Sequence, residues 1–136
     1  MVFEAKIDNL HRLNSFVLKG LNFLGCDCST KNQILLSCEE IFSNVCNYAY
    51  KNEIGFVTVS FSINFDRKLI KITFSDHGIP YNPLDREDPD INASAEDRVI
   101  GGLGIFIVKN IMDKIYYEFK DNKNFLTMEK ELLSNL

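Results

Sequence analysis

Residues 30–51 constrain the fold most, because they predict one long helix with two chemically different faces. Residues at three- and four-residue steps share one side of a helix, and an apolar set of this kind packs on a core. This set comprises Ile34, Cys38, Ile41, Phe42, Val45 and Ala49. Thr30 is expected to cap the helix, since Gln33 stands at the spacing of a capping box.

A polar stripe follows a second side of the same predicted helix. At about 100° per residue, steps of four, three and four residues stay nearly in line. The stripe consists of Glu40, Asn44, Asn47 and Lys51. A solvent-exposed helix face has the same pattern, so this stripe gains meaning only from segments further along the chain.

Short strands and two more helices surround this helix. Strands are predicted at 2–7, 56–65, 69–75, 115–119 and 125–132, and helices at 10–24 and 105–112. Short turns at 66–68 and 121–124 join neighbouring strands, so we expect antiparallel pairs. With the helices gathered on one face, the sequence predicts one α+β domain over residues 1–136. Its architecture is a two-layer sandwich of a mostly antiparallel sheet and about three helices.

Composition excludes several classes of protein. Hydrophobic residues make up 46% and charged residues 25% of the chain, which is typical of a folded domain and not of disorder. A net charge of -4 indicates no nucleic-acid partner. No apolar run reaches the length of a membrane span and no signal-peptide pattern opens the chain, so we expect a cytoplasmic protein.

The four cysteines do not predict a metal site. His11 and His77 are scattered, and the C-x-C of Cys26 and Cys28 supplies too few ligands for zinc. Reduced thiols in a reducing compartment are the better interpretation.

A glycine-bearing segment, residues 101–104, opens the last predicted helix. Glycines let a backbone approach a ligand closely, and free N–H groups at a helix start attract phosphate. A simple turn would have the same sequence, so the signal is weak alone. The chain contains neither a P-loop nor the dinucleotide fingerprint, which excludes those two families of phosphate site.

Two further elements carry polar chemistry. Asp76, at a strand end, can accept a hydrogen bond from the amine of adenine, and Gly78 leaves room for a flat base, although a plain turn would look alike. On the long helix, the oxygen of Asn44 suits Mg²⁺, and Glu40 one turn earlier suits a general base.

Together these motifs resemble the GHKL ATPase superfamily, which has the Bergerat ATP-binding fold. The motifs are E-x-x-x-N at 40–44, D-x-G-x-P at 76–80, a lid at about 81–100 and GGLG at 101–104. The sequence around 37–50 and 101–118 is most similar to the anti-sigma factor serine-protein kinases of bacterial partner-switching systems. That branch would imply a kinase that binds ATP and Mg²⁺ and phosphorylates a serine on a small anti-sigma antagonist. It would also imply a homodimer that sequesters a sigma factor.

The resemblance implies a role for individual residues. Asn44 would coordinate Mg²⁺, Glu40 would act as the base towards the serine hydroxyl, and Asp76 would recognise the adenine amine. The other implied nucleotide-binding residues are Gly78 and Pro80 at the base, Gly102, Leu103, Gly104 and Ile105 at the phosphates, and Arg98 at the terminal phosphate.

The chain departs from the family pattern at three places. Tyr48 stands where the family often has histidine, and Asn47 stands where it usually has an apolar residue. The family's threonine near the last strand has no clear match, because Thr127 is out of register and Phe125 stands in that place.

Three other functions remain open. They are a non-catalytic module whose partner affinity is set by nucleotide, the detached ATP domain of a histidine kinase, and an α+β domain without a ligand.

Overall fold

A five-stranded antiparallel sheet is the frame of the computed structural model, which describes residues 1–51, 53–85 and 103–132. The strands are β1 (Val2–Glu4), β2 (Phe56–Asn64), β3 (Leu69–Asp76), β4 (Lys114–Lys120) and β5 (Lys123–Glu131). Their order across the sheet is β1-β2-β3-β5-β4. Because β3 and β5 are neighbours, Asp76 at the end of β3 lies directly opposite Asn124 at the start of β5.

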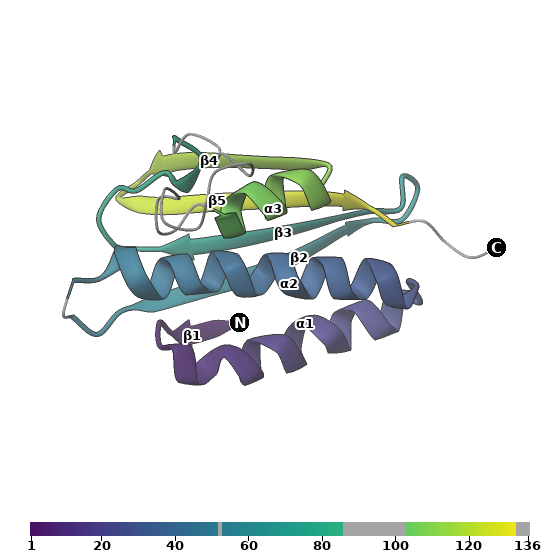
Figure 1. The fold of residues 1–136 in the computed structure, drawn as a ribbon, viewed down its shortest axis with the longest axis horizontal. Helices are drawn as coiled ribbons and strands as arrows, with labels where there is room; N and C mark the ends of the chain where they lie inside the picture. Colours follow the sequence, from purple (N-terminus) through teal and green to yellow (C-terminus); the bar gives the residue numbers. More distant parts are fainter. Residues whose placement is uncertain (52, 86–102, 133–136) are drawn as a thin grey trace, which may run out of the picture.

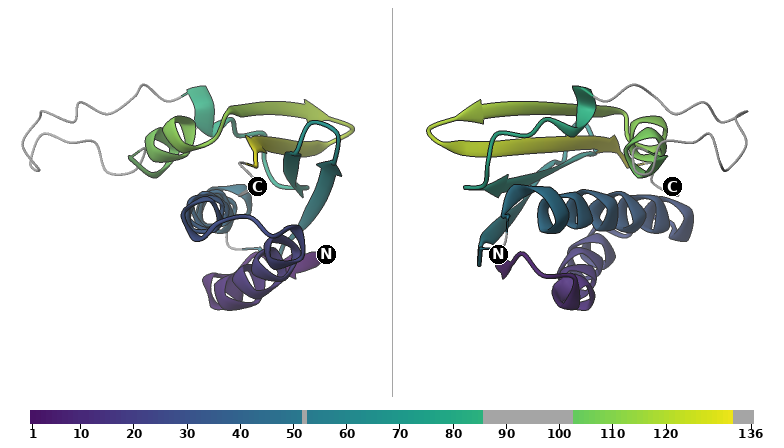
Figure 2. Two further views of the ribbon diagram at one scale, coloured as in Figure 1. Left: turned by 90° about the vertical axis from the view of Figure 1, so that its right-hand side faces the viewer. Right: turned by 60° about the vertical axis from the view of Figure 1, so that its left-hand side comes forward.

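Three helices cover one face of this sheet in the described part of the chain (Figure 1, Figure 2). They are α1 (Leu10–Leu24), α2 (Cys28–Asn44), which continues as a π-helical turn over Val45–Ala49, and α3 (Leu103–Ile111). Single 3-10 turns occupy Ile7–Asn9 and Pro83–Asp85. The long α2 lies between α1 and α3 (Figure 1). The predicted two-layer α+β sandwich is therefore confirmed.

The core between the two layers follows the predicted periodicities. Alternate strand residues face the helices and are buried, namely Val57, Val59, Ile70, Ile72, Phe74, Leu126 and Met128. The helices contribute Leu13, Val17, Leu21, Ile34, Cys38, Ile41 and Phe42. Burying one such side chain contributes about 1.5–3 kcal/mol, so α2 is held firmly against the sheet on its apolar side.

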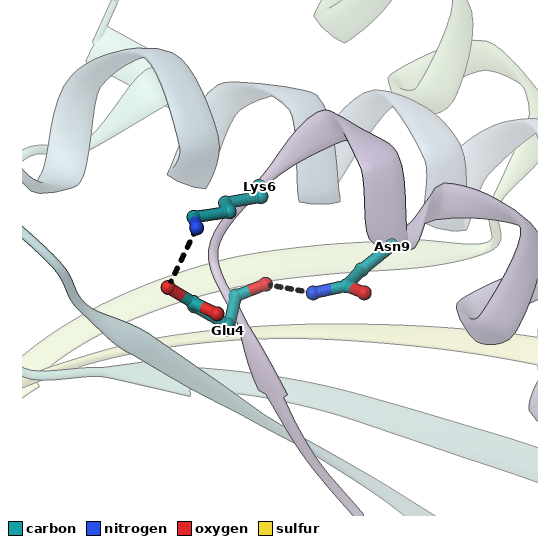
Figure 3. Close-up of polar contacts among 3 residues, drawn as sticks. All are labelled: Glu4, Lys6 and Asn9. Carbon is teal, nitrogen blue, oxygen red and sulfur yellow. Dashed lines mark hydrogen bonds and ion pairs between the residues drawn. The ribbon is translucent and has the colours of Figure 1, made fainter.

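The predicted first strand ends earlier than expected, because the chain turns after Glu4 (Figure 3). The backbone N–H of Lys6 donates to the Glu4 carbonyl at 2.8 Å, and Asn9 Nδ2 donates to the same oxygen at 2.8 Å. Lys6 Nζ lies 3.1 Å from Glu4 Oε1, a partly exposed ion pair that contributes little. These bonds direct the chain from β1 into α1.

The expected cap of the long helix was wrong. Asp27 is the N-cap of α2, and its carboxylate accepts from the backbone N–H of Thr30 at 2.8 Å. Thr30 itself is a buried residue inside the first turn. An aspartate three residues before an N–H has the same capping geometry that the sequence suggested for Thr30 and Gln33.

The far end of this helix also differs from the prediction. After Asn44 the winding becomes π-helical, and the helix stops at Ala49 with Tyr50 extended. The wider turn breaks the predicted stripe, so Asn47 is exposed and Lys51 lies beyond the helix. Only Glu40 and Asn44 keep the predicted alignment.

The β4–β5 turn is shorter than predicted. It consists of Asp121 and Asn122, whose φ angles are 53° and 59°. This left-handed geometry is the one that a two-residue hairpin requires and that Asp and Asn tolerate. Lys123 and Asn124 therefore belong to β5 and not to the turn.

All four cysteines are free, and burial raises the pKa of the Cys46 thiol to about 11, so it stays protonated at neutral pH. In the described ranges, no helix combines the length and apolarity that crossing a membrane requires. The same ranges contain no group of three or more His, Cys, Asp or Glu that could hold a metal.

Candidate functional site

A cavity between the end of α2 and the ends of β3 and β5 brings predicted site residues together. Asn44 and Asp76, which are far apart in the sequence, both line it. The apolar part of its wall comes from Ile41, Val45, Ala49, Phe74, Pro83 and Leu126, and the polar part also includes Tyr81, Tyr117 and Asn124. The cavity thus offers apolar surface around a small set of hydrogen-bonding groups, which is typical of a small-molecule site.

Asp76 is the buried carboxylate of this cavity, with 5% of its surface exposed. Its Oδ1 accepts from the backbone N–H of Gly78 and from Asn124 Nδ2, both at 2.9 Å. Burial raises the pKa of Asp76 above its ordinary value, although these two hydrogen bonds oppose the shift. No described residue donates a hydrogen bond to Oδ2, which leaves that atom as an acceptor for a ligand.

Asn44 is the last residue of α2, and it lines the cavity. Its amide nitrogen donates to the Glu40 carbonyl one turn earlier at 2.9 Å. Since a carbonyl can only accept, the nitrogen must face it, and Oδ1 is left to bind a ligand. An amide oxygen is a hard ligand of the kind that Mg²⁺ takes together with water and phosphate oxygens.

Glu40 lies against the start of α3. A β-carbon on Gly104 would stand 1.9 Å from Glu40 Oε2, so the missing side chain of Gly104 is what allows this approach. Leu103, Gly104 and Ile105 form the first turn of α3, whose backbone N–H groups have no partner within the helix. A carboxylate and a set of backbone donors therefore meet at one point.

Gly78 lies close to the end of the π-helical turn. A β-carbon there would stand 2.3 Å from the Ala49 carbonyl oxygen, and the next residue, Ile79, donates its N–H to that oxygen at 3.0 Å. The glycine therefore lets the loop after β3 pack on the end of the π-helical turn. Pro80 is exposed and does not line the cavity.

Several predicted site residues lie outside the described residues. These are Arg98 and Gly102, together with residues 86–100 of the predicted lid. Their roles remain predictions.

Sequence reasoning missed three residues that line the cavity, namely Asn124, Tyr81 and Tyr117. Asn124 is buried beside Asp76, and Tyr117 donates its hydroxyl to Asn124 Oδ1. The ring of Tyr81 lies 5.2 Å from that of Tyr48, centroid to centroid. Thr127 faces the opposite side of the sheet, where it meets Thr73 with 3.2 Å between the hydroxyl oxygens. Recognition of a two-residue turn at 121–122 would have placed Asn124 on the core face of β5.

The cavity is small in this structure. Its volume is about 30 Å³, whereas cavities that hold drug-sized ligands measure roughly 300–1,000 Å³. Tyr81, in the loop after β3, is one of the lining residues. The cavity must therefore widen before a base can enter beside Asp76.

Comparison with known proteins matches residues 3–130 to the histidine kinase-like ATPase domain. The chain belongs to this family. Its relatives include the serine-protein kinases RsbW of Bacillus cereus, 31% identical over 84 residues, and of Listeria monocytogenes, 31% identical over 90 residues. These matches cover 59% and 61% of this chain. They cover 51% and 56% of the relatives, so the chain spans about half the length of those kinases.

Solved structures agree on the fold of this ATPase domain. The RsbU and RsbW domains of a Mycobacterium tuberculosis protein match 97% of this chain and 32% of theirs, with a TM-score of 0.65 at 12% identity. The histidine kinase domain of a blue-light activated kinase from Erythrobacter litoralis matches 93% of this chain and 60% of its own, with a TM-score of 0.58 at 17% identity. The predicted family and its Bergerat-like fold are thus confirmed.

Replacing Gly78 of this ATPase domain with alanine should lower the free energy of unfolding by about 1–3 kcal/mol. The new methyl group would meet backbone at 2.3 Å, and backbone cannot rotate away as a side chain can. Gly20→Ala is the matched control, because the nearest atoms lie 3.9 Å from its β-carbon and alanine favours the interior of α1. Urea unfolding followed by circular dichroism measures both changes. Equal stabilities of the two variants would contradict this packing role.

Proposed function

We propose that this chain binds Mg-ATP and transfers its γ-phosphate to a serine of a small anti-sigma antagonist protein. The observation that carries the proposal is the convergence of Asp76 and Asn44 on one cavity in a histidine kinase-like ATPase domain. The contact of Glu40 with Gly104 at the start of α3 supplies a base and backbone donors beside it. The similarity to serine-protein kinases supports serine as the acceptor.

In this proposal, one group of residues binds the adenine base and another binds the metal and the phosphates. Asp76 Oδ2 accepts from the exocyclic amine of adenine, while the apolar wall of Ile41 and Leu126 packs on the base. Asn44 Oδ1 holds Mg²⁺, which neutralises charge on the phosphate oxygens when it is bound. The phosphates lie at the first turn of α3, where Leu103, Gly104 and Ile105 belong, with Gly102 and Arg98 proposed beside them.

The transfer step needs one proton acceptor from the protein. The serine oxygen attacks the γ-phosphorus, a new O–P bond forms, and the bond from that phosphorus to the β–γ bridging oxygen breaks, releasing ADP. The serine proton passes to the carboxylate of Glu40. Catalysis of this kind depends mostly on position and on charge stabilisation, and the general base adds about 10²–10⁴-fold.

The protein partners follow from the same proposal. An anti-sigma kinase acts on its antagonist and sequesters a sigma factor or a similar regulator, and we propose that it does so as a homodimer. We also propose the segment at about 81–100 as the ATP lid, as its sequence predicts.

Calorimetry with ATP and Mg²⁺, followed by labelled ATP and a small antagonist encoded beside this chain, tests the proposal. ATP binding with phosphoserine on the antagonist, identified by mass spectrometry, supports the kinase. Binding that changes partner affinity without phosphoserine supports a non-catalytic nucleotide-gated module instead. Absence of binding heat with every adenine nucleotide overturns both.

A further inference from the structure

Asn124 is the most highly connected polar side chain of the cavity. It makes five hydrogen bonds. Its Nδ2 donates to Asp76 Oδ1 at 2.9 Å, to the Ile79 carbonyl at 2.9 Å and weakly to the Gly78 carbonyl at 3.4 Å. Its Oδ1 accepts from the backbone N–H of Tyr81 at 3.2 Å and from the Tyr117 hydroxyl. Only 5% of its surface is exposed. A buried amide with this many partners is held in one orientation.

The partners of Asn124 also decide which way its amide points. The backbone N–H of Tyr81 can only donate, so the atom facing it must be Oδ1. The Ile79 carbonyl can only accept, so the atom facing it must be Nδ2. Asp76 Oδ1 therefore always meets a donor from Asn124, and a second donor from Gly78 meets the same oxygen.

We propose that Asn124 is a positioning residue that sets the base specificity of this site, an inference that rests on the proposed ATP binding. Two donors hold Oδ1 of Asp76 in place, so Oδ2 is the atom presented to a ligand. An ionised Oδ2 accepts from the 6-amino group of adenine and repels the 6-oxo group of inosine or guanine. Without Asn124 the carboxylate loses one of these two donors and can rotate, so this discrimination weakens.

The other bonds of Asn124 couple specificity to the shape of the cavity. Through Ile79 and Tyr81 it ties the loop after β3 to β5, and through Tyr117 it ties that loop to β4. The loop carries Tyr81, which lines the cavity. One side chain thus sets both the acceptor for the base and the wall beside it.

The test compares the dissociation constants of ATP and inosine triphosphate, measured by calorimetry at fixed pH and Mg²⁺. These nucleotides differ at the base and share the triphosphate. The unchanged protein should prefer ATP by about 10- to 100-fold, the range expected for one hydrogen bond to a charged acceptor. Asn124→Leu should reduce the preference to within about threefold. Asn124→Thr should give an intermediate preference, because its hydroxyl can donate only one bond.

Thr127→Val is the matched control, because Thr127 is 7% exposed on the same strand and faces the other side of the sheet. It should leave the ATP preference unchanged. If Asn124 had a purely structural role, its replacement would weaken the binding of both nucleotides equally and leave the ratio of their dissociation constants unchanged. That result in a folded Leu or Thr variant overturns the inference. If the unchanged protein binds neither nucleotide, the proposed function itself is wrong, which is a distinct outcome.

Discussion

Replacing Asp76 with asparagine should weaken the binding of Mg-ATP by about 100-fold and should improve the binding of inosine triphosphate. The reason lies in the two donors that face Oδ1, from Gly78 and Asn124. Both need an acceptor, so the oxygen of the new amide takes this position and its nitrogen replaces Oδ2. A donor then faces the amine of adenine, whereas it suits the 6-oxo group of inosine.

The pH dependence gives this prediction a second readout. Burial raises the pKa of Asp76, so acidification protonates its Oδ2 at a higher pH than for an exposed aspartate. ATP affinity of the unchanged protein should fall as pH decreases through that raised pKa, and the asparagine variant should lack this step. Because the folded state binds this proton more tightly than the unfolded state, the ionised carboxyl costs stability at neutral pH. The variant should therefore stay folded.

Asp121→Asn is the control for the same chemical change. Asp121 lies in the β4–β5 turn with a φ of 53°, which asparagine adopts readily. The Asp121→Asn variant should bind ATP with the same affinity as the unchanged protein. An Asp76→Asn variant that is folded and binds ATP normally would remove Asp76 from the base site.

The fold was predictable because apolar residues recur along each helix and strand at the regular spacing of that element. The apolar steps of Ile34, Cys38 and Ile41 determine the buried side of α2, and alternation determines that of β2 and β3. Element ends were less predictable, since they depend on single bonds. The carboxylate of Asp27 starts α2, and the π-helical turn after Asn44 has no signal in hydrophobic spacing.

The site was predictable only in part, for a related reason. Asp76, Asn44 and Glu40 stand in short motifs that can be read locally. Asn124 cannot be found in this way, because its importance depends on a strand pairing with Asp76 across 48 positions of sequence. A one-residue error at the turn 121–122 would move it to the other face of the sheet. Long-range register is therefore the information that local patterns lack.

Replacing Glu40 with glutamine should reduce phosphate transfer to the antagonist by about 10²–10⁴-fold, the contribution of a general base. ATP affinity should change by less than about threefold, because Glu40 does not line the cavity that holds the base. Glutamine keeps the shape of the side chain beside Gly104 but cannot take up the serine proton. Single-turnover transfer of labelled phosphate, with ATP binding measured separately, distinguishes the two effects.

The neighbouring residue on α2 provides a close control. Glu39 accepts from Asn14 Nδ2 at 2.6 Å, so its carboxylate is engaged with α1 and not with α3. Glu39→Gln should transfer phosphate at the normal rate. Gly104→Ala should reproduce part of the Glu40 defect at little cost in stability, because the flexible Glu40 side chain can rotate away from the new methyl group. If Glu40→Gln and Glu39→Gln transfer phosphate equally fast, Glu40 is not the base, and the contact between α2 and α3 serves packing alone.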